Sequence, residues 1–113
     1  MKIEKFGVYL ANLEPRFGTE PGKVRPVVVV QSDLINKDHP STIVCPLTSH
    51  VIKELEILRV HVSGKDLGLE KDSDILVDQL RAIDNRRLVK HLGKLSTGLQ
   101  KKLLENIQIL IFE

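Results

Sequence analysis

The chain alternates short apolar runs with polar segments rich in glycine and proline, a pattern typical of short strands joined by turns. Four consecutive valines at positions 27–30 are β-branched, and such a run favours a strand buried on both faces. Other apolar runs predict further strands. The expected strands are residues 6–10, 24–31, 41–47, 57–62 and 73–77, and the segments 81–84 and 88–92 are expected to be short strands or turns. Residues 11–23 are expected to form a long loop.

The C-terminal segment has a helical pattern. Thr97 followed three residues later by Gln100 is a capping-box sequence that begins a helix. Apolar residues then recur on one face at helical spacing, namely Leu99, Leu103, Leu104, Ile107, Leu110 and Ile111. This stripe is either core, packed on the sheet, or part of an interface with another chain. Many short strands and one helix predict a mainly β fold with a C-terminal helix (α+β), in which a small antiparallel barrel or curled sheet removes exposed edges.

Length and composition limit the classes of protein. With 113 residues, of which 42% are hydrophobic and 28% charged, the chain is expected to form a single domain over residues 1–113. No apolar run approaches the roughly 18 residues of a membrane helix. Lys2, Glu4 and Lys5 interrupt the N-terminus where a signal peptide would be apolar. Because the single cysteine, Cys45, has no disulfide partner, we expect a cytoplasmic protein with no membrane partner.

The sequence contains no metal-binding motif. Neither Cys-x-x-Cys nor His-x-x-x-His occurs, and Cys45 lies in an apolar segment where a small buried thiol is expected. Asp72 and Asp74 flank Ser73 and are interpreted as turn and strand-end residues. We therefore expect no metal site and no cofactor.

Basic residues concentrate near the C-terminus. Between residues 79 and 102, seven Lys or Arg stand against one acid, Asp84, whereas acids cluster between residues 54 and 78. This distribution suits a polyanion bound on one face, or it describes an ordinary solvated surface. The chain has only three Phe, one Tyr and no Trp, which argues against a sheet on which bases stack.

One arginine stands at the entrance of the valine-rich strand. Arg25 precedes Pro26, whose ring fixes its own φ and favours an extended conformation for the residue before it. Gly18 and Gly22 in the preceding loop permit positive φ and the close approach of a ligand. Since a buried strand has no need of a charge at its entrance, we interpret Arg25 as a functional residue.

Several short motifs occur together and in order along the chain. They are GVYL at 7–10, GTE at 18–20, VRPVVVVQ at 24–31, PLTS at 46–49, GLEKDS at 68–73, DQLR at 78–81 and ID at 83–84. Together they resemble the MazF/PemK family, the toxins of bacterial type II toxin–antitoxin pairs. The resemblance implies an SH3-like small barrel of the MazF/PemK/CcdB kind and a homodimer. It also implies a metal-independent, sequence-specific endoribonuclease (mRNA interferase) that cuts single-stranded RNA and is inhibited by a cognate antitoxin protein.

The resemblance assigns catalytic roles to Arg25 and Thr48. RNA cleavage by the 2′-hydroxyl leaves a 2′,3′-cyclic phosphate and a 5′-hydroxyl, and it needs a base, an acid and stabilisation of the phosphorane charge. Arg25, with its planar fork, is expected to stabilise that charge, and the role of the acid is also open to it. Thr48 is expected to donate to a phosphoryl oxygen or to hold the 2′-hydroxyl; its alternative role is a turn cap. Glu20 is the preferred carboxylate for the base, or else a solvated loop acid.

Further residues are expected to bind RNA. They are Phe17, Thr19, Lys23, Ser49, His50, Gln79 and Arg81. Phe17 either stacks on a base or covers a groove for a protein partner, and Arg81 either contacts RNA or pairs with Asp84 or Asp78. His61 lies on a half-exposed strand and is interpreted as solvated or internally hydrogen-bonded.

A function of another class is compatible with the same fold. The gyrase-poisoning toxin CcdB resembles this architecture and has no nuclease activity, so the alternative is a non-catalytic toxin that binds a protein target such as DNA gyrase. An inhibitor of that kind has no need of both Arg25 and Thr48 at a strand entrance. The pair therefore favours the ribonuclease.

Overall fold

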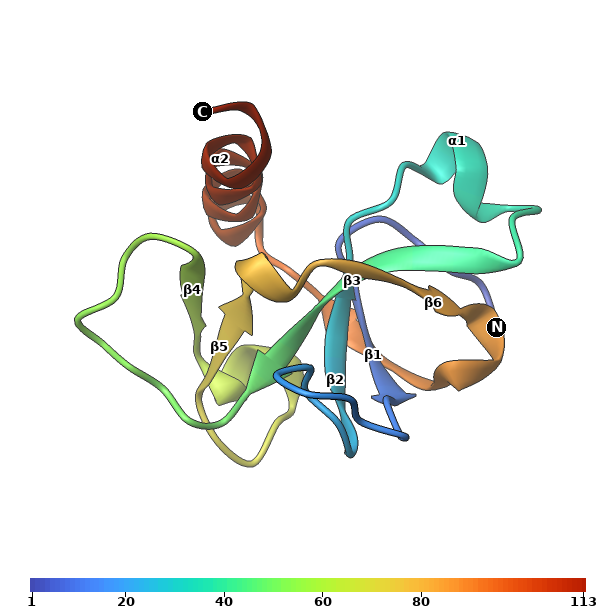
Figure 1. The fold of residues 1–113 in the computed structure, drawn as a ribbon, viewed down its shortest axis with the longest axis horizontal. Coiled ribbons are helices and arrows are strands. Elements are labelled where there is room, and N and C mark those ends of the chain that lie inside the picture. The colour runs from blue at the N-terminus through green and yellow to red at the C-terminus, as the bar shows by residue number, and fades with distance from the viewer.

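A computed structural model describes residues 1–113 as a curved antiparallel sheet of seven strands with a helix at the C-terminus (Figure 1). The strands are β1 (Gly7–Asn12), β2 (Val24–Val29), β3 (Ser41–Thr48), β4 (Arg59–Val62), β5 (Ser73–Leu76), β6 (Arg81–Asp84) and β7 (Leu88–Lys94). The helices are α1 (Asp33–Asn36) and α2 (Thr97–Phe112), and short 3-10 turns occupy Gly64–Leu67, Val77–Gln79 and Asn85–Arg87. The expectation of a mainly β fold with a C-terminal helix is confirmed. No helix is long and apolar enough to cross a membrane.

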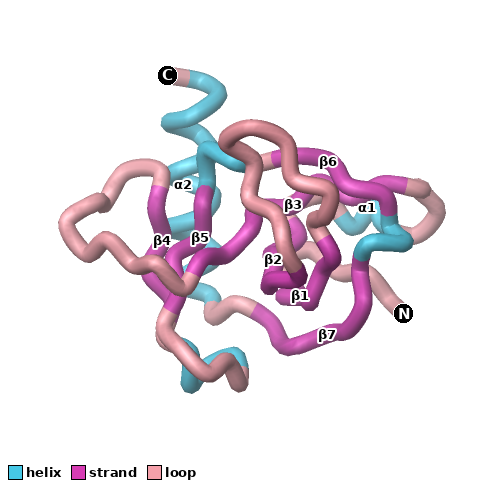
Figure 2. The backbone as a smooth tube through the Cα atoms, turned by 60° about the horizontal axis from the view of Figure 1, so that its bottom comes forward, coloured by secondary structure: helices cyan, strands magenta, loops and turns pink.

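Strand β3 organises the sheet. The strand order is β4-β5-β3-β2-β1-β7, and β6 also pairs with β3. One edge of β3 pairs with β2, while the other edge pairs first with β6 and then, at Leu47 and Thr48, with β5. The sheet therefore divides along β3, with β5 and β4 to one side and β6 to the other (Figure 1). Strand β7 runs along the outer side of β1 (Figure 2).

The valine run of β2 lies at the centre of the sheet and is buried on both faces, as predicted. Val27 and Val29 pack in one apolar cluster with Tyr9, whereas Val28 points the other way and packs in a second cluster with Cys45. All five side chains are completely buried. Successive side chains of a strand point to opposite faces, so one β-branched run contributes to two cores.

Several strand boundaries differ from the sequence expectations. β1 continues to Asn12, which pairs with Val24, so the loop begins only at residue 13. β2 ends at Val29, although the Val30 N–H still donates to the Ile43 carbonyl at 3.0 Å, and the Gln31 side chain beyond it donates to Asn36 Oδ1 at 2.9 Å. β4 begins only at residue 59, because Leu58 has a φ of 67° that interrupts the extended backbone. The segments expected to be strands or turns are strands β6 and β7.

Helix α2 is capped by a different residue from the one predicted. Ser96 is the N-cap, and its hydroxyl accepts a hydrogen bond from the Leu99 N–H at 3.4 Å. The Gln100 side chain donates to the Leu95 carbonyl at 2.9 Å and so does not close a capping box. The predicted cap at Thr97 is therefore wrong by one residue, because two hydroxyl residues stand side by side and both are able to cap.

Only part of the apolar stripe of α2 is core. Leu103 is fully buried, and Leu99 and Ile107 pack against the same cluster. The other predicted members are exposed, namely Leu104 at 44%, Leu110 at 37% and Ile111 at 54%. The helix packs on β4 and on the Val77–Gln79 turn, and its last turn projects beyond the sheet (Figure 1).

Candidate active site

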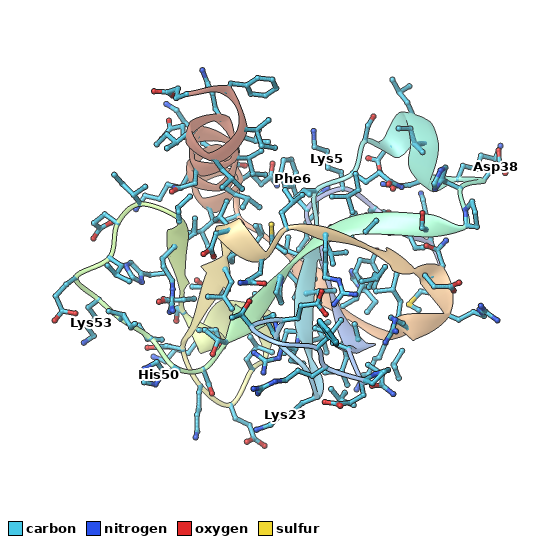
Figure 3. All side chains as sticks on the ribbon, viewed as in Figure 1. Lys5, Phe6, Lys23, Asp38, His50 and Lys53 are labelled. Atoms are coloured by element: carbon cyan, nitrogen blue, oxygen red, sulfur yellow. The ribbon has the colours of Figure 1, made fainter.

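Two of the three predicted catalytic residues, Arg25 and Thr48, line one open pocket of about 640 Å³. β2 and β3 are antiparallel, with Val27 opposite Pro46. Arg25 lies two residues before Val27 and Thr48 lies two residues after Pro46, so the two residues meet at the same end of the sheet. The predicted RNA-binding residues Lys23, Ser49 and His50 line the same pocket. Figure 3 shows Lys23 and His50 at this end of the molecule. Residues that are distant in sequence thus form one site.

Two main-chain carbonyls orient the Arg25 guanidinium. Nε donates to the Gly22 carbonyl at 2.8 Å, and Nη1 donates to the Leu47 carbonyl at 3.3 Å. Burial, and after it the positive charge of Arg16, lowers the pKa of Arg25 from its ordinary value. Arginine nevertheless remains protonated in proteins, and the three N–H groups left over are donors for an anion. The geometry suits charge stabilisation and does not make Arg25 a base.

The loop before Arg25 has a defined backbone. Gly18 has a φ of 58° in open space, which confirms that its conformation favours glycine. Gly22 has no positive φ; a Cβ there would lie 2.6 Å from the Cβ of Arg16, so glycine is needed for space. The other positive φ belongs to Lys23, at 66°. Its N–H donates to the Glu14 carboxylate, and its carbonyl accepts from the Leu13 N–H at 2.8 Å, which holds this conformation.

Thr48 is both a turn cap and a member of the pocket. Its Oγ1 accepts a hydrogen bond from the His50 N–H at 3.2 Å. This bond uses the oxygen as an acceptor and leaves the hydroxyl hydrogen free to donate. The two roles considered for Thr48 are therefore compatible, and the cap orients the hydroxyl.

Two further hollows continue the pocket across the surface. One, of about 350 Å³, shares Arg25 and Lys23 with the first and is also lined by Thr19 and Glu20. The next, of about 430 Å³, shares Thr19 with it and is lined by Gln79. Hydrophobic residues of this third hollow include Leu55 and Ile57. Shared lining residues thus connect Thr48 to Gln79 in one surface path.

Glu20 and Arg81 lie near each other. Glu20 Oε1 is 3.8 Å from Arg81 Nη1, and both side chains are partly exposed. The alternative in which Arg81 pairs with Asp84 or Asp78 is wrong. Asp84 is instead bound by Arg86, whose side chain lowers the pKa of Asp84 to about 2. The Asn85–Arg87 turn folds the Arg86 side chain back onto Asp84.

Phe17 stands apart from the pocket residues. It is 82% exposed in the loop between β1 and β2. The structure also places Glu70 and Lys71 in the Arg25 pocket, and sequence reasoning gave neither a role. The only signal for them was the GLEKDS motif that contains both. The cations of the pocket are Lys23, Arg25 and Lys71, whereas from the basic C-terminal segment only Arg81 lies beside the path.

A buried ionic cluster lies behind Thr48. Asp74, in register with Thr48 across β3 and β5, has no exposed surface. Its carboxylate accepts from Arg59 Nη1 at 2.9 Å, from His61 Nδ1 at 2.6 Å and from the Ile52 N–H at 3.0 Å. Burial by itself would raise the pKa of Asp74, but these hydrogen bonds together hold it below its ordinary value. His61 is internally hydrogen-bonded at Nδ1, as interpreted, but its buried Nε2 has no hydrogen-bond partner, and Asp74 is more than a strand-end residue.

Comparison with known proteins identifies the family. The chain matches the model of the PemK-like, MazF-like toxin of type II toxin-antitoxin system over residues 4–111. It is 38% identical over 109 residues to the protein named Endoribonuclease EndoA of Bacillus subtilis (strain 168), covering 96% of this chain and 94% of that protein.

Solved structures share the fold. MazF (Form-I) from Deinococcus radiodurans superposes with a TM-score of 0.85 at 22% identity, covering 100% of this chain and 99% of that chain. An endoribonuclease in complex with its cognate antitoxin, from a mycobacterial species, has a TM-score of 0.77 at 14% identity, covering 95% and 92%. At identities of 22% and 14%, these two structures support only the fold. The match over nearly the whole length, together with the Bacillus subtilis relative, shows that this chain belongs to the PemK-like, MazF-like family of toxins of type II toxin–antitoxin systems.

Proposed function

We propose that the pocket of Arg25 and Thr48 cleaves single-stranded messenger RNA at a short sequence, and that the chain acts as one toxin domain in the cytoplasm. The chain is an RNA-cleaving toxin of its family, and its relative at 38% identity is named an endoribonuclease. The observation that supports the site is the joint pocket, in which an oriented guanidinium and a free hydroxyl donor lie together.

The proposed reaction needs only protein groups. The 2′-hydroxyl loses its proton to a base, and its oxygen attacks the neighbouring phosphorus while the bond from phosphorus to the 5′-oxygen breaks. The leaving 5′-oxygen takes a proton from Arg25 or from solvent, so the products are a 2′,3′-cyclic phosphate and a 5′-hydroxyl. The free N–H groups of Arg25 stabilise the charge that develops on the phosphoryl oxygens. The Thr48 hydroxyl donates to one of these oxygens or aligns the 2′-hydroxyl for attack.

A carboxylate is proposed to accept the 2′-hydroxyl proton. Glu20 lines the hollow that it shares with Arg25, and it lies 3.8 Å from Arg81, with no hydrogen bond to Arg25. Its side chain is 43% exposed, so it is accessible to substrate. A Glu20→Gln variant is expected to lose the rise of cleavage rate with pH that a carboxylate base produces. A pH–rate profile of unchanged shape would exclude Glu20 from this role.

The RNA is proposed to follow the surface path from Thr48 to Gln79. Lys23, Ser49 and His50 contact phosphates or bases near the cleaved bond, and Thr19, Gln79 and Arg81 contact nucleotides further along. Phe17, exposed on its loop, stacks on a base at the margin of this path.

Protein partners are also part of the proposal. A cognate antitoxin is proposed to bind this chain, as one binds the mycobacterial endoribonuclease, and to inhibit it by covering the RNA path. A homodimer is expected, and the exposed apolar residues Ile111 and Phe112 at the end of α2 supply surface for protein contacts. The gyrase-binding alternative is not favoured, because it gives no reason for Arg25 and Thr48 to share a pocket.

The first test is cleavage of a long single-stranded RNA by the purified chain in excess EDTA, with the product ends mapped. Cuts at one short recurring sequence, with cyclic phosphate and 5′-hydroxyl ends, are the expected result. Arg25→Ala and Thr48→Ala are expected to abolish cutting, while Arg86→Ala, at an exposed arginine outside the pocket, retains it. No cleavage by the folded protein, with or without added metal, together with inhibition of gyrase supercoiling, would favour the protein-target function.

A further inference from the structure

We infer that Asp74 is a positioning residue, whose buried carboxylate holds the main chain that follows Thr48 and thereby orients the Thr48 hydroxyl in the pocket. The inference rests on the proposed function, since it takes Thr48 as a catalytic residue. It concerns a cluster formed by Asp74, Arg59 and His61, which takes no part in the bond-breaking step, although Arg59 also lines the third hollow of the surface path.

Hydrogen bonds to the main chain of His50 connect Asp74 to Thr48. Arg59 Nη1 donates both to Asp74 Oδ2 at 2.9 Å and to the His50 carbonyl at 3.0 Å. The N–H of the same His50 donates to Thr48 Oγ1 at 3.2 Å. Asp74 Oδ2 also accepts directly from the Ile52 N–H at 3.0 Å. Asp74 Oδ2 therefore restrains the loop directly at Ile52 and, through Arg59, at His50, both within four residues of Thr48.

His61 fixes the orientation of that carboxylate. Its Nδ1 bonds Asp74 Oδ1 at 2.6 Å, which leaves Oδ2 for the loop and for Arg59. The Asp74 side chain has no exposed surface and that of Arg59 is only 17% exposed, so water competes little for these bonds. Hydrogen bonds between charged groups in such surroundings are short and strong.

The loop has few other ties to the sheet. Main-chain hydrogen bonds of residues 49–57 run within the loop itself, from Val51 to Ser49 and from Leu55 to Ile52. Without the Asp74 and Arg59 bonds, the start of the loop would be free to move while β3 and the core remained paired. Displacements of about 1 Å in a catalytic group are able to lower a rate about 100-fold.

Stability alone does not account for this cluster. A buried ion pair is often no more stabilising than apolar residues of similar volume, because both charges lose their hydration. On β5 the side chain of Asp74 points to the opposite face from that of the buried Ile75, and it pairs in register with Thr48 on β3 and His61 on β4. A charge at this position is explained by the loop that it holds.

The test compares variants in cleavage of a short RNA that contains the target sequence. Asp74→Asn and Arg59→Gln are expected to lower kcat about 10-fold or more, with a smaller change in KM, because a misplaced hydroxyl acts on the transition state. Arg59→Lys is expected to recover most of the rate, since the single Nη1 atom makes both bonds and an ammonium group replaces it. Asp72→Asn is the matched control, because Asp72 accepts from the Gly64 N–H at 2.9 Å and has no bond to the loop.

Amide hydrogen exchange provides a readout that does not depend on cleavage. In Asp74→Asn the Ile52 amide is expected to exchange about 10-fold faster or more, while strand amides such as that of Val28 keep their protection. Arg59 is partly exposed, so Arg59→Gln carries the test if Asp74→Asn does not fold. Unchanged Ile52 exchange, or a loosened loop with unchanged kcat, would overturn the inference. If the wild-type chain cleaves no RNA, the proposed function is refuted, but the anchoring role is still tested by hydrogen exchange. An Ile52 amide that stays as protected in Asp74→Asn and Arg59→Gln as in wild type would refute the anchoring role.

Discussion

Arg25 Nη1 donates a hydrogen bond to the carbonyl oxygen of Leu47 at 3.3 Å, which ties the arginine to the residue immediately before Thr48. A second bond, from Nε to the Gly22 carbonyl, fixes the guanidinium plane. Both acceptors are neutral main-chain groups, and no carboxylate forms an ion pair with Arg25. Its charge therefore remains available to an anionic substrate, and the backbone alone determines its direction.

Replacement of Arg25 by lysine is expected to lower kcat about 100-fold or more, with the fold intact, since removal of one oriented donor has effects of this size. A single ammonium group is unable to keep both carbonyl bonds and still present a planar set of donors. Steady-state cleavage kinetics and circular dichroism measure the two effects. Arg86→Lys, at an exposed arginine bound to Asp84, is the control. Cleavage by Arg25→Lys near the wild-type rate would show that positive charge alone is sufficient.

The Thr48 hydroxyl is expected to be essential and its methyl group dispensable. Thr48→Ser keeps the hydroxyl and should cleave within several-fold of wild type, whereas the isosteric Thr48→Val should lose about 100-fold or more in kcat. Thr97→Val, at an exposed position at the start of α2, controls for the general effect of this substitution. Equal rates for the Ser and Val variants of Thr48 would remove the hydroxyl from the mechanism.

The two adjacent leucines of α2 are expected to differ strongly in their contribution to stability. Leu103→Ala empties a completely buried position and should lower the free energy of unfolding by about 2–5 kcal/mol. Leu104 is 44% exposed, so Leu104→Ala should lower the free energy of unfolding by less than about 1 kcal/mol. Urea denaturation at several protein concentrations measures both. A large, concentration-dependent loss for Leu104→Ala would instead place that residue in a subunit interface.

Acid is expected to destabilise the protein partly through Asp74. Its pKa is lowered in the folded state, so between the folded value and the ordinary value near 4 the unfolded chain binds more protons. The free energy of unfolding that Asp74 contributes is thus complete above the ordinary value and is lost as pH falls through the folded one. Urea denaturation between about pH 5 and 2 should show a weaker pH dependence for Asp74→Asn than for wild type.

Salt distinguishes Asp74 from the exposed Asp84. The pKa of Asp84 is also lowered, to about 2, by the exposed Arg86. At about 1 M salt the screening length between exposed charges is about 3 Å. Such salt should therefore reduce the contribution of the exposed Asp84 to the pH dependence of stability and leave most of the contribution of the buried Asp74. An acid dependence of Asp74→Asn equal to that of wild type would contradict the role of the buried cluster in stability.

The Cys45 thiol is expected to be unreactive in the folded protein. Burial raises the pKa of Cys45 to about 12, so almost no thiolate forms near neutral pH. The side chain also has no exposed surface, so a reagent has no access to the sulfur. An aromatic disulfide reagent at about pH 8 should label the native protein only as fast as it unfolds, and should label it fully in guanidinium. Rapid labelling of the native state would show that β3 opens locally.

Local sequence determined the elements because their causes are local. The β-branched run at 27–30 buries both faces wherever a sheet forms, and the apolar spacing around Leu103 favours a helix without outside help. Pro26 restrains Arg25 through the covalent backbone itself. The motifs that resemble the family also pointed to Arg25 and Thr48, and the structure places these two residues in one pocket.

The partners of charged side chains were decided only by tertiary structure. Arg81 faces Glu20 rather than a nearby aspartate, and Asp74 collects Arg59 and His61. Each of these contacts depends on which strands are neighbours and on their register, and a shift of one residue would move every side chain to the other face. No local pattern encodes such pairings, because the energy that selects the register comes from burying the two apolar cores together. The site is assembled as a consequence of that packing.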